Sequence, residues 1–132
     1  MVQTTAPSPA LVAAWQQRFA RERAALAGEE ERAHAQAEQC ALLLVRAFGA
    51  SRVYLFGSLC TPQRLHRHSD IDLAASGVPP AQYLTALDAL SRIAERGVDL
   101  VRLEDATADM VRYITENGTV LHERTQVRPA DR

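Results

Sequence analysis

The chain has 132 residues and a formal net charge of −1, with 15 lysine and arginine residues against 16 acidic ones. This length allows one domain with a hydrophobic core but not two, and the balanced charge offers no overall electrostatic surface for nucleic acid. No apolar run is long enough to span a bilayer and no secretory signal begins the chain, so we expect neither membrane insertion nor direct nucleic-acid binding.

Two features of the composition limit the catalytic mechanisms that the chain could use. The chain contains no lysine, which excludes a Walker-type phosphate loop, Schiff-base catalysis and a covalent lysyl-nucleotide intermediate. An enzyme of this composition that uses nucleoside triphosphates must rely on metal ions, backbone amides and arginine. The two cysteines, Cys40 and Cys60, lack the spacing of a metal site, and we interpret them as reduced thiols of a cytoplasmic protein.

The N-terminal third is predicted to be helical. We expect residues 1–8 to form a disordered tail and residues 9–48 to form a helical extension, either two helices or one long helix kinked at Gly28. The second half should pack on a sheet and stop at Gly49. The first half either covers the core or serves as an arm for an oligomer or a partner, and we favour the arm. The apolar face is made by Leu11, Trp15, Phe19 and Leu26, and then by Ala33, Ala37, Cys40, Leu44 and Phe48.

Residues 49–123 are predicted to form an α/β (α+β) core, a small mixed β-sheet packed with helices, followed by a flexible tail over residues 124–132. Short apolar runs between turn residues predict four strands, over 51–56, 71–75, 98–101 and 119–122. Helical spacing predicts helices over 81–96, ended by Gly97, and over about 105–117, with Asp105 as a capping residue. The buried face of the first of these helices is predicted at Tyr83, Leu87, Leu90 and Ile93, with Ala94 beside it.

The most informative stretch runs from Val53 to Leu73. An apolar strand ends at Gly57-Ser58, and Asp70-Ile71-Asp72 opens the next strand. Residues two apart on a strand point to the same face, so Asp70 and Asp72 should stand side by side and repel each other unless a cation lies between them. Hard divalent ions such as Mg²⁺ bind carboxylates together with substrate phosphates. Because glycine allows a close backbone approach, the Gly57-Ser58 turn predicts a triphosphate site facing a metal site.

Other polar residues extend this interpretation. Asp99 lies inside the apolar run Val98–Val101, where a carboxylate is costly unless it is paired or bound to metal; the alternative is an edge-strand aspartate facing water. Arg64 and Arg67, in the loop before Asp70, are candidates to bind the phosphates, although a solvated basic loop is the simpler interpretation of each. The nearby pair His66 and His68 lacks a third ligand for a transition metal.

The pattern Gly57-Ser58 followed by Asp70-x-Asp72 resembles the signature of the DNA polymerase β-like nucleotidyltransferase superfamily. Its flanks, Leu55-Phe56 and Ser69 to Leu73, most resemble the minimal MNT proteins that pair with HEPN toxins, and the resemblance covers roughly residues 47–123. The loop departs from the pattern: eleven residues separate Ser58 from Asp70, one more than usual. It also carries Leu59-Cys60-Thr61-Pro62 where many relatives have a small residue followed by Arg-Gly.

The resemblance implies a nucleotidyltransferase fold in which Asp99 is the third metal ligand and the general base beside Asp70 and Asp72. It implies two Mg²⁺ ions, with Mn²⁺ as a substitute, and ATP as the substrate. It also implies that the chain is an antitoxin that transfers AMP to a hydroxyl, expected to be that of a tyrosine, of a cognate HEPN ribonuclease toxin. Two alternatives stay open: a non-catalytic antitoxin that acts by occlusion, and a small-molecule nucleotidyltransferase of the aminoglycoside-modifying type that works as a homodimer.

Overall fold

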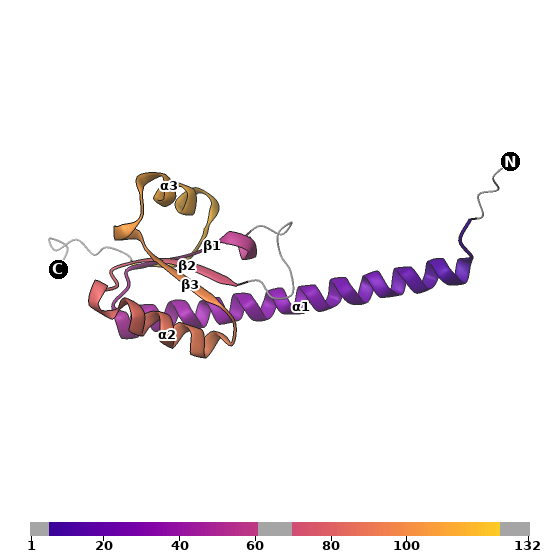
Figure 1. The fold of residues 1–132 in the computed structure, drawn as a ribbon, viewed down its shortest axis with the longest axis horizontal. Coiled ribbons are helices and arrows are strands. Elements are labelled where there is room, and N and C mark those ends of the chain that lie inside the picture. The colour runs from indigo at the N-terminus through magenta and orange to yellow at the C-terminus, as the bar shows by residue number, and fades with distance from the viewer. Residues whose placement is uncertain (1–5, 61–69, 125–132) are drawn as a thin grey trace.

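The computed structural model describes residues 6–60 and 70–124. Within them a four-stranded mixed sheet is packed between helices, which confirms the predicted fold class (Figure 1). The described helices are α1 (Pro9–Phe48), α2 (Tyr83–Ala94) and α3 (Ala108–Asn117), with short 3₁₀ turns η1 (Gly57–Cys60), η3 (Pro80–Gln82) and η4 (Leu103–Asp105). The strands are β1 (Arg52–Phe56), β2 (Ile71–Ser76), β3 (Val98–Arg102) and β4 (Thr119–Glu123), each within about one residue of its predicted bounds at both ends.

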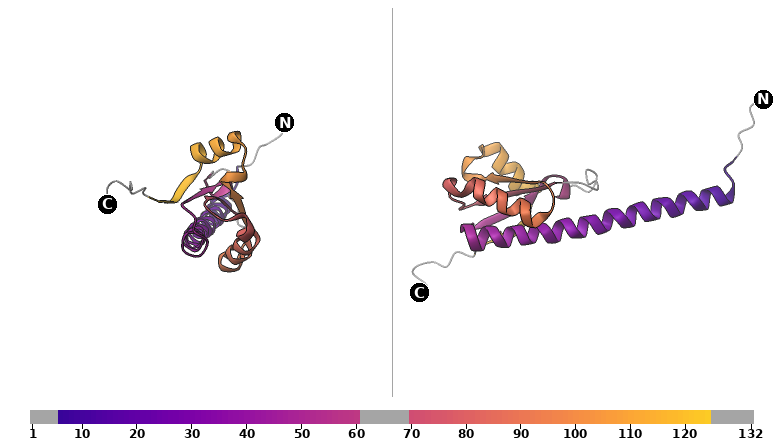
Figure 2. Two further views of the ribbon diagram at one scale, coloured as in Figure 1. Left: turned by 90° about the vertical axis from the view of Figure 1, so that its left-hand side faces the viewer. Right: turned by 60° about the horizontal axis from the view of Figure 1, so that its bottom comes forward.

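The strand order is β3-β2-β1-β4. β1 runs antiparallel to both β2 and β4, whereas β2 and β3 run parallel, because α2 carries the chain back to the start of the sheet between them. Helices α1 and α2 cover one face of the sheet and α3 covers the other (Figures 1 and 2).

Alternation along the strands sorts the side chains between the two faces. Leu55, Ile71 and Leu73 are fully buried against α1 and α2 in the larger core cluster. Tyr54, Ala74 and Ile114 belong to a second, smaller cluster beneath α3. Since every second residue of β2 serves the larger core, the residues between them, including Asp72, are directed to the α3 face.

α1 is one continuous helix of 40 residues, so the alternative of two helices separated at Gly28 is wrong. Ser8 caps its start by accepting a hydrogen bond from the Leu11 backbone N–H, and Gly49, in the left-handed conformation with φ 76°, ends it as predicted. Seven alanines between Pro9 and Gly28 give this segment a high intrinsic helix propensity, which explains why one glycine does not interrupt it. None of the helices in the described ranges is long and apolar enough to cross a bilayer.

The two halves of α1 have different environments. The predicted face of the second half is confirmed, since Ala33, Ala37, Cys40 and Leu44 are buried on the sheet and Phe48 is half-buried. The described residues before Leu26 are all exposed. The first half therefore does not cover the core but projects beyond it as an arm (Figure 1).

Three details of the helix predictions are wrong. α2 ends at Ala94 because Glu95 takes the left-handed conformation with φ 57°, so Gly97 is not its terminator. The predicted buried face of α2 is confirmed at Leu90 and Ala94, and Tyr83 and Leu87 pack against the core. Ile93 is wrong, since it is 40% exposed, and the small side chain of Ala86 is buried instead.

The third error concerns the start of α3. Thr107 caps this helix by accepting from the Met110 backbone N–H, whereas Asp105 forms an ion pair with Arg102. The guanidinium of Arg102 is only 9% exposed and needs a compensating negative charge, which the acid three residues later supplies.

Two leucines of α1 test this packing. Leu44 is fully buried and Leu42, on the other side of the same helix, is 48% exposed. We expect Leu44→Ala to lower the free energy of unfolding by about 3 kcal/mol, because it leaves a cavity beneath the sheet. Leu42→Ala should change it by less than about 0.5 kcal/mol. Urea denaturation of both variants measures the difference, and similar losses would contradict the docking of α1.

Candidate active site

Three chain segments meet at one end of the sheet. β1 finishes at Phe56 and turns through Gly57 into η1, while β2 begins directly after Asp70. In the antiparallel pair, Phe56 lies opposite Asp72, and in the parallel pair, Asp72 lies opposite Asp99. The sheet thus brings the predicted turn and two of the predicted acids into neighbouring positions.

Asp72 and Asp99 interact directly through their side chains. The pKa of Asp72 is raised from its ordinary value of 3.8 to about 6, most of all by burial and then by the charge of Asp99, a hydrogen bond shared with Asp99 and the charge of Asp70. Asp99 itself is exposed, so the pair opens to the surface on the face that also carries α3. Two carboxylates that compete in this way offer a set of oxygen donors that suits a hard divalent cation, which would allow both to be ionised.

The backbone of Gly57 lies so close to the Asp72 side chain that position 57 has no room for a Cβ atom. Its φ of +78° lies in the left-handed region, and a Cβ atom at this position would stand 2.1 Å from Oδ2 of Asp72. No side chain fits between the turn and the acid, so glycine is needed both for the backbone conformation and for the contact. Ser58 follows half-buried in η1, and its predicted contact with the phosphates stays a prediction.

Gly97 performs a similar role for Asp70, and this role was not predicted from the sequence. A Cβ at Gly97 would lie 2.4 Å from Oδ1 of Asp70. The chain held only part of the signal, in that Gly97 stands two residues before Asp99 just as Asp70 stands two residues before Asp72. The parallel register that brings the two pairs together is a property of the folded sheet. The space beside Gly97 lets the Asp70 carboxylate turn toward the next strand.

Asp70 also lines a hollow of about 390 Å³ between the start of β2 and α1. In this hollow the Arg96 guanidinium, on a side chain only 14% exposed, donates to Oε1 of Gln36 at 2.7 Å and to Oε2 of Glu29 at 3.2 Å. Arg32 also pairs with Glu29, and its hydrogen bond contributes most to holding the pKa of that carboxyl below its ordinary value. The acid end of the sheet is thus connected to α1 through a network of charged groups.

The fold brings only some of the predicted site residues close to one another. Within residues 6–60 and 70–124, no three His, Cys, Asp or Glu side chains are grouped closely enough to hold a metal ion. Asp72 and Asp99 form a pair, and Asp70 lies one position further along with its carboxylate against Gly97. A shared metal site for all three acids therefore stays a prediction. Arg64 and Arg67 lie outside the described residues.

The contact between Gly57 and Asp72 is tested by a matched pair of glycines. Gly49 has nearly the same φ, +76°, but nothing lies within 4 Å of a Cβ there. We expect Gly49→Ala to lower the free energy of unfolding by about 1 kcal/mol through backbone strain alone. Gly57→Ala should cost more, because it must also displace the Asp72 carboxylate, and most of the excess should disappear in an Asp72→Ala background. Equal losses in urea denaturation would contradict the contact.

The pKa of Asp72 predicts a dependence of stability on pH. Because this pKa is raised in the folded protein, its contribution to stability is fully present below about 3.8 and is lost as the pH rises through about 6. Measured by denaturant unfolding without divalent cations, the wild type should lose stability over this range relative to Asp72→Asn. Parallel pH curves for the two proteins would show that the carboxyl does not titrate with a raised pKa.

The family model for polymerase β nucleotidyltransferases matches residues 38–127, which include β1, the turn at Gly57 and all three acids. A comparison with curated proteins finds no match.

Several solved structures share the fold. A toxin–antitoxin crystal structure with AMP-PNP is 28% identical, with a TM-score of 0.57, over 67% of this chain and 74% of its own. A mutant MntA–HpeT toxin–antitoxin structure is 26% identical, with a TM-score of 0.56, over the same shares. An MNT antitoxin in complex with a tri-AMPylated HEPN toxin from Shewanella oneidensis, 23% identical with a TM-score of 0.52 over 66% of this chain and 70% of its own, shares the fold. These likenesses agree with the resemblance to MNT proteins, and the family match shows that the chain belongs to the polymerase β nucleotidyltransferases.

Proposed function

We propose that this chain is an antitoxin that transfers AMP from ATP to a tyrosine hydroxyl of a cognate HEPN ribonuclease toxin and thereby neutralises it. The observation that supports this most is the pairing of Asp72 with Asp99 against the Gly57 turn, in a chain that belongs to a nucleotidyltransferase family. The similar toxin–antitoxin structure with AMP-PNP supports an adenine nucleotide as the substrate.

Each site residue has a distinct role in this proposal. The turn at Gly57 brings backbone N–H groups close to the triphosphate, and Ser58 donates its amide and hydroxyl to the terminal phosphates. Asp70, Asp72 and Asp99 would hold Mg²⁺, which when bound neutralises the phosphates and makes the acceptor hydroxyl more acidic. Arg64 and Arg67 are proposed to offset the charge of the departing group.

The transfer is a displacement at the α-phosphorus of ATP. The acceptor oxygen forms a bond to this phosphorus, and the bond to the bridging oxygen breaks, so pyrophosphate leaves with the electron pair. Asp99 accepts the proton of the acceptor hydroxyl, because it is the acid of the pair that is exposed and therefore reachable by an incoming group. Asp72, half-buried against Gly57, would help to hold the cation to which the triphosphate binds.

A protein acceptor fits the form of the site. Among the described residues Asp70 and Asp99 are exposed, so the acids open to the surface at one end of the sheet. The surface needed to position the hydroxyl must then come largely from the acceptor itself, as it would with a folded protein.

A second candidate function is an antitoxin that acts by occlusion alone. It is favoured by one observation, namely that no three potential ligands among the described residues are grouped to hold a metal. Incubation of the chain with labelled ATP, Mg²⁺ and the product of the neighbouring gene separates the two functions. A gain in mass of one AMP on the partner supports the transferase, whereas full neutralisation by an Asp70→Ala/Asp72→Ala variant, without transfer, supports occlusion.

The division of roles between the acids is tested by Asp99→Ala. We expect the transfer rate to fall by about 1,000-fold, because the proton acceptor is lost, while ATP binding in the presence of Mg²⁺ remains largely intact through Asp70 and Asp72. Single-turnover transfer and calorimetric ATP titration measure the two effects. Asp88→Ala, which removes an exposed acid paired with Arg92 on α2, is the control. A parallel loss of ATP affinity in Asp99→Ala would show that the assigned roles are wrong.

A further inference from the structure

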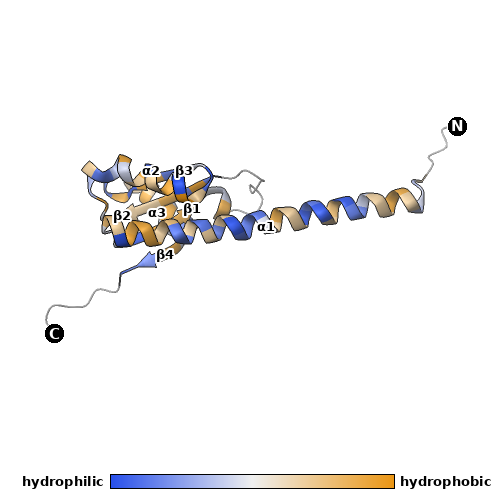
Figure 3. Ribbon diagram, turned by 90° about the horizontal axis from the view of Figure 1, so that it is seen from below, coloured by the Kyte–Doolittle hydropathy of each residue, from blue (hydrophilic) through white to orange (hydrophobic). Residues whose placement is uncertain are grey.

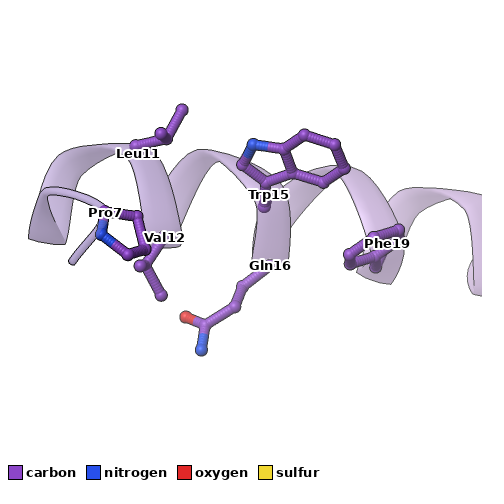
Figure 4. Close-up of a pocket in the computed structure, with 6 residues that line it drawn as sticks. All are labelled: Pro7, Leu11, Val12, Trp15, Gln16 and Phe19. Atoms are coloured by element: carbon purple, nitrogen blue, oxygen red, sulfur yellow. The ribbon is translucent and has the colours of Figure 1, made fainter. Parts of the chain in front are cut away.

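The projecting half of α1 carries an exposed apolar surface. We define the arm stripe as Leu11, Val12, Trp15 and Phe19, whose exposed fractions lie between 38% and 49%. The rings of Trp15 and Phe19 lie one turn apart with centroids separated by 5.6 Å, and with Pro7 and Gln16 the stripe lines a shallow pocket (Figure 4). Hydrophobic residues recur along this part of α1 when the helix is viewed from below the sheet (Figure 3).

The arm stripe continues the face that α1 buries on the sheet. Trp15 and Ala33 are 18 residues apart, as are Phe19 and Ala37, and 18 residues make about five full turns of an α-helix. The exposed aromatic rings therefore point in nearly the same direction as the alanines packed against the core. A molecule bound to the arm stripe would lie on the same side of α1 as the sheet, next to the body of the protein.

The direction of the arm is fixed at its root. Arg96 binds Glu29 and Gln36 where α1 leaves the body, and Asp70 and Gly97 line the same hollow. Trp15 precedes Glu29 by 14 residues, which corresponds to about 21 Å along the helix axis. The arm thus extends from the end of the sheet at which the acids lie (Figure 1). By the helical periodicity its stripe faces the space in front of that end.

The size and charge of the surface indicate its occupant. Four apolar side chains at about half exposure offer about 350 Å², less than half of the ~800 Å² that each partner contributes to a standard interface. This part of the arm carries three arginines, Arg18, Arg21 and Arg23, against one acid, Glu22, which pairs with Arg18 at 3.2 Å; Arg18 also lies over the Trp15 ring at 6.0 Å. Two copies docked stripe to stripe would bring two basic segments together over a small area, which disfavours a dimer.

We propose that the arm stripe is a docking surface for the acceptor protein, which binds Trp15 and Phe19 in an apolar groove with an acidic rim while its target hydroxyl reaches the acids. This inference rests on the proposed function. A small second contact suits a partner already held at the acid site, since the two contacts together give an affinity that neither provides alone.

The test compares Trp15→Ala/Phe19→Ala with Leu42→Ala, a control on the opposite side of the same helix and of similar exposure. With the HEPN protein of the neighbouring gene as acceptor, we expect the double variant to raise the KM for that protein about 30-fold. Its kcat at saturation and its KM for ATP should not change, because the acid site is intact. Gly28→Pro, which breaks the arm but leaves the stripe, should cause a similar loss.

Calorimetric titration of the same HEPN protein and sedimentation of the chain alone complete the design. An unchanged KM and unchanged affinity in the double variant would overturn the docking role. So would self-association of the wild type, or binding to phosphatidylcholine–phosphatidylserine vesicles, that the double variant abolishes. If the wild type transfers no AMP, the proposed function fails, and the loss or retention of HEPN affinity in the double variant still decides whether the arm docks a partner.

Discussion

The carboxylates of Asp72 and Asp99 are held next to each other by the parallel pairing of β2 and β3, and the resulting repulsion is the constraint on which the site depends. The packing of the sheet must supply the free energy that keeps them together. Gly57 leaves space for the carboxylate of Asp72, and Gly97 leaves space for that of Asp70. The site therefore depends on these two glycines as well as on the acids. A divalent cation would turn this unfavourable arrangement into a binding site.

Much of this arrangement follows from local sequence pattern. The four strands were predictable because apolar runs between turn residues leave few other structures, and the direction of Asp72 away from the larger core follows from the period of a strand. The errors arise where tertiary contacts decide. Asp105 forms an ion pair with the buried Arg102 and does not cap α3, and no local sequence signal shows that Arg102 is buried. The space beside Gly97 depends on a register between strands that the sequence does not contain.

The body and the arm of the chain have different origins of stability and, we infer, different tasks. The family match begins at residue 38, within the part of α1 that packs on the sheet, so the projecting half lies outside it. The body is held by buried apolar contacts, whereas the arm relies on helix propensity and on the ion pairs of Arg96 at its root. The candidate docking surface is thereby linked to the body that holds the proposed catalytic residues by one continuous helix.

A crystal structure of the chain with Mn²⁺ and a non-hydrolysable ATP analogue, in which anomalous scattering locates the metal, tests the central claim most directly. We predict Mn²⁺ among the carboxylates of Asp70, Asp72 and Asp99, with the triphosphate against the turn at Gly57-Ser58. Metal bound away from these acids, or a triphosphate held in the hollow around Arg96 without contact to Asp72 and Asp99, would contradict the account.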